Sequence, residues 1–80
     1  MIKVGSVVRL SDSFCESVQA DHDMANTLGI VREVFPKRGQ VPARARVQWD
    51  DGFSSGALIR NLSEYRGVVP LATKQELGLV

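Results

Sequence analysis

The chain opens with an alternation of apolar and polar residues that predicts a β-strand over residues 2–10. Ile2, Val4, Val8 and Leu10 fall on one face of such a strand, because successive side chains of a strand point to opposite faces of the sheet. We therefore expect this first strand to contribute one apolar face to the core of the domain.

A run of β-branched and aromatic residues predicts a second strand over residues 28–35. Gly29 within this run indicates a bulge or a close approach of another backbone segment. Pro36 ends the strand, and Lys37-Arg38-Gly39 favours a turn immediately after it.

The third predicted strand, residues 43–49, has the cleanest alternation in the chain. Its apolar face carries Ala45, Val47 and Trp49. The Asp51-Gly52 pair then predicts a tight hairpin turn, since glycine adopts positive φ without strain. A fourth strand is expected over residues 53–59.

After a short turn at residues 60–63, a fifth strand is expected over residues 65–70. The tail carries Thr73-Lys74-Gln75-Glu76, which has the pattern of a capping box, and Gly78 follows it. A capping box followed by a glycine is typical of a short helix, so the tail predicts a single helical turn.

The polar connection at residues 11–27 is the longest in the chain. Ser13-Phe14-Cys15-Glu16 has the pattern of a capping box, and Phe14 and Val18 are four residues apart, which predicts a helical turn or two. Connections of this length in small domains generally carry function or fold onto themselves. We expect it to be the most mobile connection or the main contact surface outside the strands.

Five short strands with one long early loop and one tight late hairpin suit a small closed or nearly closed barrel. Three segments resemble the G-x-x-V-x-L, G-x-V and V-x-W-D-x-G pattern of SH3-like barrels: Gly5-Ser6-Val7-Val8-Arg9-Leu10, Gly29-Ile30-Val31 and Val47-Gln48-Trp49-Asp50-Asp51-Gly52. Residues 57–62 are similar to the fourth strand and 3₁₀ turn of such barrels.

This resemblance extends over residues 4–63 and includes Mind-bomb/HERC-type domains, the small barrel subunit of photosystem I and ribosomal KOW-type domains. It implies an all-β, five-stranded SH3-like barrel, to which the residue pattern adds a long loop after the first strand and a short C-terminal helical turn. The matching residues build core and turns, so the resemblance supports a fold and not a particular function.

One barrel family of this size is enzymatic. Type II dihydrofolate reductases resemble the chain in the opening G-x-x-V-R and in Val47-Gln48, and four of their protomers surround one pore. Their motif continues with Ile and Tyr, where this chain has Trp49 and Asp50. Four Asp50 carboxylates around one pore would repel each other, so this enzymatic function is the least favoured of the alternatives.

The length of 80 residues predicts one domain spanning residues 1–80, with a core thin enough that oligomerisation would help to stabilise it. No run reaches the about 20 apolar residues of a membrane span, and the first residues lack the pattern of a signal peptide. Cys15 is the single cysteine, which fits a reducing, cytoplasmic setting. The residues expected in the core are Val8, Leu10, Val31, Val47 and Trp49.

Few residues offer chemistry. Asp21-His22-Asp23 places a histidine beside carboxylates, but adjacent residues of a loop point in different directions and rarely bind one metal ion. Cys15 has no recognisable orienting group, and Asp50 and Asp51 are explained by the tight turn. The glycines are dispersed, so no phosphate-binding loop is formed. We expect no catalytic residues, no metal site, no cofactor and no enzymatic activity.

The charge distribution is more informative than the net charge of +1. Residues 11–26 carry four carboxylates and no Lys or Arg, whereas residues 37–46 carry four cations and no carboxylate. Both could be solvated loops, or they could mark opposite electrostatic faces. The candidate binding residues, for nucleic acid or an acidic partner, are Lys37, Arg38, Arg44 and Arg46.

The prediction for function is a non-enzymatic binding module for a protein partner or for itself as a homo-oligomer, with no membrane partner. A thin core and many apolar residues leave apolar surface for a partner to cover. The alternative is a nucleic-acid-binding barrel that uses the basic hairpin at residues 37–46 to contact phosphates.

Overall fold

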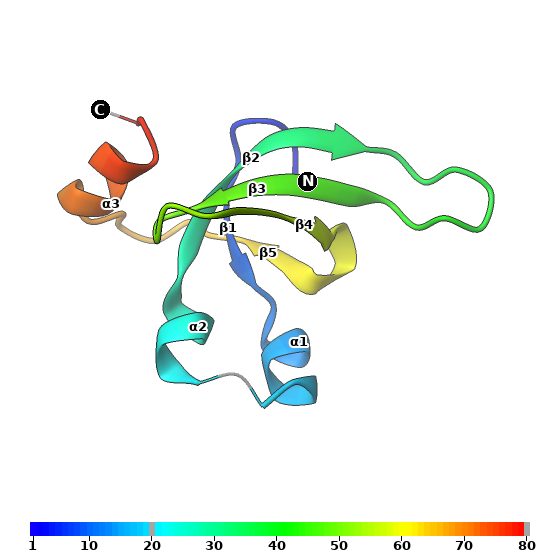
Figure 1. The fold of residues 1–80 in the computed structure, drawn as a ribbon, viewed down its shortest axis with the longest axis horizontal. Coiled ribbons are helices and arrows are strands. Elements are labelled where there is room, and N and C mark those ends of the chain that lie inside the picture. Colours follow the sequence, from blue (N-terminus) through cyan, green and yellow to red (C-terminus); the bar gives the residue numbers. More distant parts are fainter. Residues whose placement is uncertain (20, 80) are drawn as a thin grey trace.

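The computed structural model of the chain describes residues 1–19 and 21–79. Five strands form one antiparallel sheet in the order β4-β3-β2-β1-β5 (Figure 1). The strands are β1 (Val7–Leu10), β2 (Leu28–Phe35), β3 (Arg44–Trp49), β4 (Ser54–Leu58) and β5 (Leu62–Glu64). The helices are α1 (Asp12–Ser17), α2 (His22–Asn26), the 3₁₀ turn η1 (Ile59–Asn61) and α3 (Leu71–Glu76).

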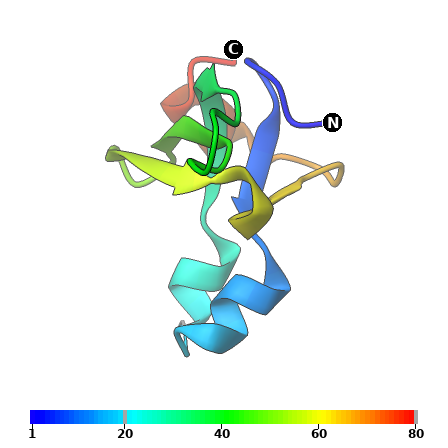
Figure 2. The same cartoon turned by 90° about the vertical axis from the view of Figure 1, so that its right-hand side faces the viewer.

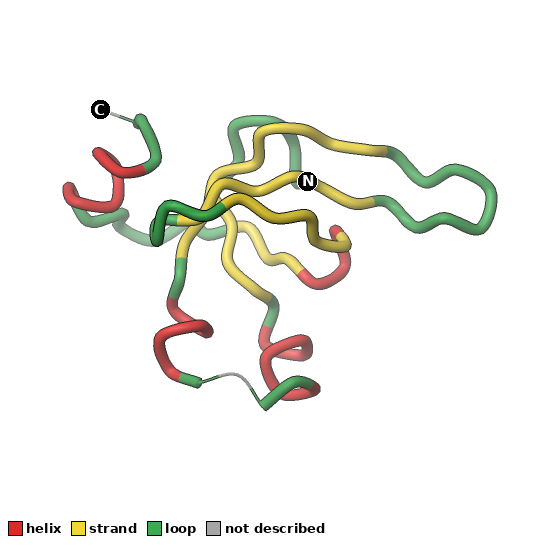
Figure 3. The backbone as a smooth tube through the Cα atoms, in the orientation of Figure 1, coloured by secondary structure: helices red, strands yellow, loops and turns green. Residues whose placement is uncertain are grey.

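The sheet is bent and open. Over the described residues, β4 pairs only with β3 and β5 pairs only with β1, so that the two edge strands are not joined. The tube drawing shows α1 and α2 together below the sheet, and α3 at the left, at the end away from the projecting β2–β3 hairpin (Figure 3). The predicted mainly β, five-stranded organisation is confirmed, with three short helices added to it.

The core lies on the inner face of this sheet. Its buried residues are Val8, Val31, Ala45, Val47, Trp49 and Leu62, and each is at most 9% exposed. Four of the five predicted core residues are therefore confirmed, and Leu10 is half-buried against the same cluster. The alternation of β3 is also confirmed, since Ala45, Val47 and Trp49 are buried while Arg44 and Arg46 are exposed.

The β2–β3 hairpin is the longest paired unit, and β2 has the predicted bounds. Its register runs from Gly29 opposite Trp49 to Phe35 opposite Arg44, with a bulge between Val31 and Glu33. A Cβ atom at Gly29 would lie 2.5 Å from Val47 Cγ1 and 2.7 Å from the Trp49 ring. The same Cβ atom would lie 3.1 Å from the Gln48 backbone oxygen, which confirms the close backbone approach predicted at Gly29, and the side-chain contacts bring Trp49 directly against β2.

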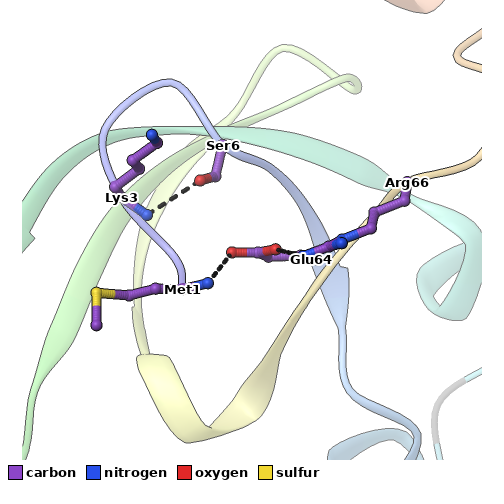
Figure 4. A network of polar contacts seen from close by, with 5 residues as sticks. All are labelled: Met1, Lys3, Ser6, Glu64 and Arg66. Carbon is purple, nitrogen blue, oxygen red and sulfur yellow. Dashed lines mark hydrogen bonds and ion pairs between the residues drawn. The ribbon is translucent and has the colours of Figure 1, made fainter.

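The first strand is shorter than predicted. Residues 3–6 form a turn in which the Lys3 N–H donates to Ser6 Oγ at 3.0 Å, and Gly5 adopts a φ of +92° (Figure 4). The turn breaks the alternation, so Val4 is exposed rather than buried in the core. Sequence periodicity alone could not show that the strand begins only at Val7.

A carboxylate on β5 holds the amino end of the chain in place. The Met1 amino group lies 2.8 Å from Glu64, and the Arg66 guanidinium lies 2.9 Å from the same carboxylate (Figure 4). Hydrogen bonds from these two cations, the amino group first, lower the pKa of Glu64 below its ordinary value.

The fifth strand lies earlier in the chain than predicted, and the prediction of a strand over residues 65–70 was wrong. After η1 the chain enters the sheet at once, because Leu62 is buried opposite Leu10 of β1. The Tyr65 N–H still donates to the Val7 C=O of β1 at 2.8 Å, and residues 66–70 then leave the sheet as an irregular segment in which Val68 is exposed. Val68, Val69 and Pro70 resemble a strand end in sequence but make no strand pairing.

The predicted C-terminal helical turn is confirmed as α3, although its start is different. The helix begins at Leu71, with Pro70 at its N-cap and no side-chain cap, so the proposed capping box at Thr73 is wrong. Gly78, with a φ of +73°, ends it as expected. Leu77 is fully buried, and its C=O accepts a hydrogen bond from Arg32 of β2 at 3.0 Å.

None of the helices in the described ranges is both long and apolar enough to cross a lipid bilayer.

Candidate functional site

A groove of about 750 Å³ opens between the α1–α2 segment and the β3–β4 face of the sheet. Its apolar lining comes from strands and helices that are distant in sequence. These side chains are Leu10, Phe14, Met24, Trp49, Ala57 and Leu58. Ligand sites in proteins typically have volumes of about 300–1,000 Å³ and mainly apolar walls, so the groove has the size and character of a binding site.

Trp49 forms the floor of the groove. It is 9% exposed, and its indole Nε1–H donates to Ser55 Oγ on β4 at 2.8 Å. The absence of a side chain at Gly29 leaves room for the ring on its other side. The ring is therefore fixed in orientation, with its polar edge satisfied and its remaining open surface facing the groove.

The two helices that form the outer wall are each started by a side-chain cap. The Phe14 N–H donates to Ser11 Oγ at 3.2 Å, and the Met24 N–H donates to Asp21 Oδ1 at 2.8 Å. Both are N-cap bonds that satisfy an otherwise unpaired N–H in the first turn. They place Phe14 and Met24 in the lining of the groove.

Three carboxylates lie at the rim of this apolar surface: Asp21, Asp23 and Asp51. All three residues are exposed. Among the side chains that the structure describes, none of these three carboxylates forms an ion pair. The rim therefore carries negative charge that no described cation neutralises, next to an apolar floor, and this arrangement favours a ligand with apolar groups flanked by cations.

The β4 edge provides backbone groups to the same groove. Trp49 N–H donates to the Phe53 C=O at 2.7 Å and Ile59 N–H donates to the Ala43 C=O at 3.0 Å. Along an antiparallel ladder, hydrogen-bonded pairs such as these two alternate with pairs that are not hydrogen-bonded to each other. Every second residue of β4 therefore directs its N–H and C=O away from β3. These outward-facing residues are Ser54, Gly56 and Leu58.

The basic hairpin predicted from the sequence as a binding site lies outside the groove. Arg44 and Arg46 are exposed on β3, while Lys37 and Arg38 lie at the projecting end, where Arg38 pairs with Val41. Arg46 contacts Glu33 at 3.4 Å, which neutralises part of its charge. The Arg44 guanidinium lies over the Phe35 ring, 5.2 Å from its centre. Among the described side chains, Lys37, Arg38 and Arg44 form no ion pair.

The other residues considered for chemistry have structural roles where the structure describes them. The Asp50 carboxylate accepts from the Leu28 N–H at 3.2 Å, and the Asp51 carboxylate accepts from the Phe53 N–H at 3.0 Å. Gly52 turns the chain with a φ of +91°, which confirms the predicted hairpin turn. Cys15 is half-buried, with Sγ 4.0 Å from the Leu10 C=O.

The loop predicted at Asp21-His22-Asp23 is instead the start of α2, with Asp21 as its N-cap. The side chain of His22 lies outside the described residues. Within the described part of the chain, no three His, Cys, Asp or Glu side chains cluster closely enough to hold a metal ion.

Sequence reasoning placed the candidate site on the hairpin and missed the groove. Leu10, Met24 and Leu58 have no common motif, and only the folded chain brings them together. The excess of carboxylates in residues 11–26 was the sequence signal that could have indicated the groove, because two of the three rim carboxylates lie in this segment.

Comparison of the chain with protein-family models, curated proteins and solved structures gives no match.

Proposed function

We propose that this chain is a non-enzymatic binding module whose groove holds an extended, apolar and basic segment of a protein. The observation that carries the proposal is the groove of about 750 Å³ with an apolar floor and three carboxylates without ion-pair partners among the described side chains. The apolar floor favours burial of aliphatic side chains, and the rim favours lysine or arginine beside them.

The free edge of β4 supports an extended conformation for the bound segment. Ser54, Gly56 and Leu58 direct backbone groups away from β3, and Gly56 and Leu58 also line the groove. A segment that lies along this edge would gain main-chain hydrogen bonds, which are independent of its sequence, while its side chains reach the apolar floor. Its charge and apolar pattern would then determine specificity.

We also propose that the open sheet is a strongly bent SH3-like barrel. The 3₁₀ turn at Ile59–Asn61, between the fourth and fifth strands, supports this assignment, since the resemblance implies a turn there. The long insertion between β1 and β2, folded as two helices, forms one wall of the groove, in keeping with the contact role expected of residues 11–27. We propose a cytoplasmic location on the basis of the single cysteine.

Titration with synthetic peptides tests the function. The probes are a short peptide that alternates leucine and arginine, the same peptide with glutamate in place of arginine, and one with glycine in place of leucine. Trp49 is the only tryptophan, so its fluorescence reports on the floor of the groove. The leucine–arginine peptide should bind, shift the amide signals of Met24 and Leu58, and bind more tightly than both other peptides.

Met24→Ser tests the apolar wall, because Met24 is exposed and its replacement should leave the fold intact. Losing a methionine contact should weaken peptide binding about tenfold, equivalent to about 1.4 kcal/mol. Val68→Ser is the matched control, since Val68 is more exposed and does not line the groove. Equal binding of all three peptides, or equal effects of the two substitutions, would contradict the proposal.

The cations on the projecting hairpin favour a second candidate function, in which the hairpin contacts the phosphates of a nucleic acid. Arg46 is already paired with Glu33, so Lys37, Arg38 and Arg44 are the cations available for such contacts. Each phosphate contact on a single strand should add about −0.7 to the slope of log affinity against log salt. Replacing Arg38 and Arg44 by Gln should flatten that slope by about 1.4, and an unchanged slope would exclude this function.

A further inference from the structure

We propose that the segment bound in the groove is the tip of the β2–β3 hairpin of a second copy of this chain, so that copies join head to tail. The hairpin tip is defined here as residues 35–44. This inference rests on the proposed function of the groove as a site for an apolar, basic segment, and it specifies the occupant.

The hairpin tip has the chemistry that the groove requires. Phe35 and Val41 are large apolar residues that are 39% and 53% exposed. Together with Pro36 and Pro42 they surround a hollow of about 260 Å³, whose other walls are Arg38 and Arg44. Apolar side chains that are open to water and flanked by cations are therefore concentrated in one short segment.

The charges of the two surfaces are matched. The tip carries Lys37, Arg38 and Arg44, and the groove rim carries three carboxylates. Within the described part of one chain, none of these six groups forms an ion pair. Contact between two copies would place cations opposite carboxylates, which accelerates association and disfavours the wrong orientation. Because these charges are exposed, their attraction should weaken with added salt.

The geometry makes this contact intermolecular. Pairing from Gly29–Trp49 to Phe35–Arg44, with a bulge between Val31 and Glu33, carries the tip outward, and Arg46 bridges to Glu33 across the same hairpin. The two views show the hairpin projecting away from α1 and α2, which form one wall of the groove (Figures 1 and 2). The ladder would have to break before a tip could reach its own groove.

Tip and groove are different surfaces, so a bound pair of copies still has one free groove and one free tip. Such heterologous contacts produce either a closed ring or an open chain of copies. The paired hairpin is already ordered before binding, which limits the entropy lost when it enters a groove. Association should therefore depend on concentration and extend beyond the dimer.

Charge reversal with light scattering tests the proposal. The tip variant is Lys37→Glu with Arg38→Glu, and the groove variant is Asp23→Lys with Asp21→Asn, where asparagine preserves the N-cap of α2. The parent should associate at low salt between micromolar and millimolar concentrations, and each variant alone should associate at least about tenfold more weakly. An equimolar mixture of the two variants should regain association, since each then offers a complementary surface to the other.

The matched control is Lys3→Glu with Lys74→Glu, which changes net charge as much as the tip variant but lies outside both surfaces. It should associate like the parent. A tip variant that associates like the parent, or a mixture of the two reversed variants that stays monomeric, would overturn the inference.

The peptide titration keeps the two proposals separable. If the parent stays monomeric at low salt while its groove binds the leucine–arginine peptide, self-pairing is wrong and the proposed function stands. If the groove binds neither the peptide nor a second copy, both are wrong. If the tip variant loses only nucleic-acid binding, the hairpin has the alternative role and self-pairing is wrong.

Discussion

Replacing Gly29 by alanine tests the packing that places Trp49 beneath the groove. The added methyl group would lie 2.5 Å from Val47 Cγ1 and 2.7 Å from the Trp49 ring, well inside contact distance. Both neighbours are core residues on β3, so neither can move without disturbing the sheet. Inserting a methyl group into a packed core costs about 1–3 kcal/mol. For a domain of this size, each kcal/mol lowers the melting temperature by about 4–8 °C.

Gly56→Ala is the matched control. Gly56 also lies in a strand and lacks a positive φ, but a Cβ atom there would come only within 4.0 Å of the Ala45 C=O. Alanine in a strand interior is favoured over glycine by about 0.5–1 kcal/mol, so this variant should be as stable as the parent or more stable. Urea unfolding followed by circular dichroism at low protein concentration measures both. Equal stabilities of the two variants would refute the close packing of β2 against Trp49.

Three further substitutions test other parts of the account. Trp49→Ala should lower the free energy of unfolding by about 3–5 kcal/mol, and an unchanged melting temperature would show that the ring is not packed. Ser11→Ala should lower stability by about 0.5–2 kcal/mol because it removes the N-cap bond of α1, whereas Ser13→Ala should change stability little. A larger loss of stability for Ser13→Ala in urea unfolding would mean that Ser13 caps the helix, as the sequence pattern suggested. Because its folded-state pKa is lowered, Glu64 stabilises the fold at neutral pH and loses this contribution as the pH falls below the ordinary carboxyl value of 4.5 and through the lowered pKa. The melting temperature of Glu64→Gln should thus fall less than the parent's on acidification, and parallel curves would contradict the role of its two cationic partners.

The strands with strong local signals could be predicted from sequence. Leu28–Phe35 has the predicted bounds, and Arg44–Trp49 differs by one residue, because alternation and the Asp51-Gly52 turn act locally. The errors arose where local pattern and tertiary packing disagree. Val4 continues an apolar alternation that the Gly5 turn interrupts, and residues 65–70 look like a strand although Leu62 already occupies the partner position on β1.

The candidate site was less accessible to sequence reasoning. The opposite charges of residues 11–26 and 37–46 were visible in the sequence. Charge alone could not show that the first segment forms one wall of an apolar groove and that the second projects from the sheet. Asp21 was read as part of a loop, although its carboxylate caps α2. Residues that line the groove are contributed from Leu10 to Asn61, so only folding assembles them.

Spin labelling of the hairpin tip tests the head-to-tail contact most directly. Gln40→Cys in a Cys15→Ser background places one nitroxide on the tip, and this chain is mixed with an isotope-labelled chain that carries no nitroxide. If the tip of one copy lies in the groove of another, the nitroxide should broaden the amide signals of Met24, Ser55 and Leu58 in the labelled chain, and added salt should remove the broadening. Association without broadening at these three residues, or with broadening confined to another surface, would contradict the account.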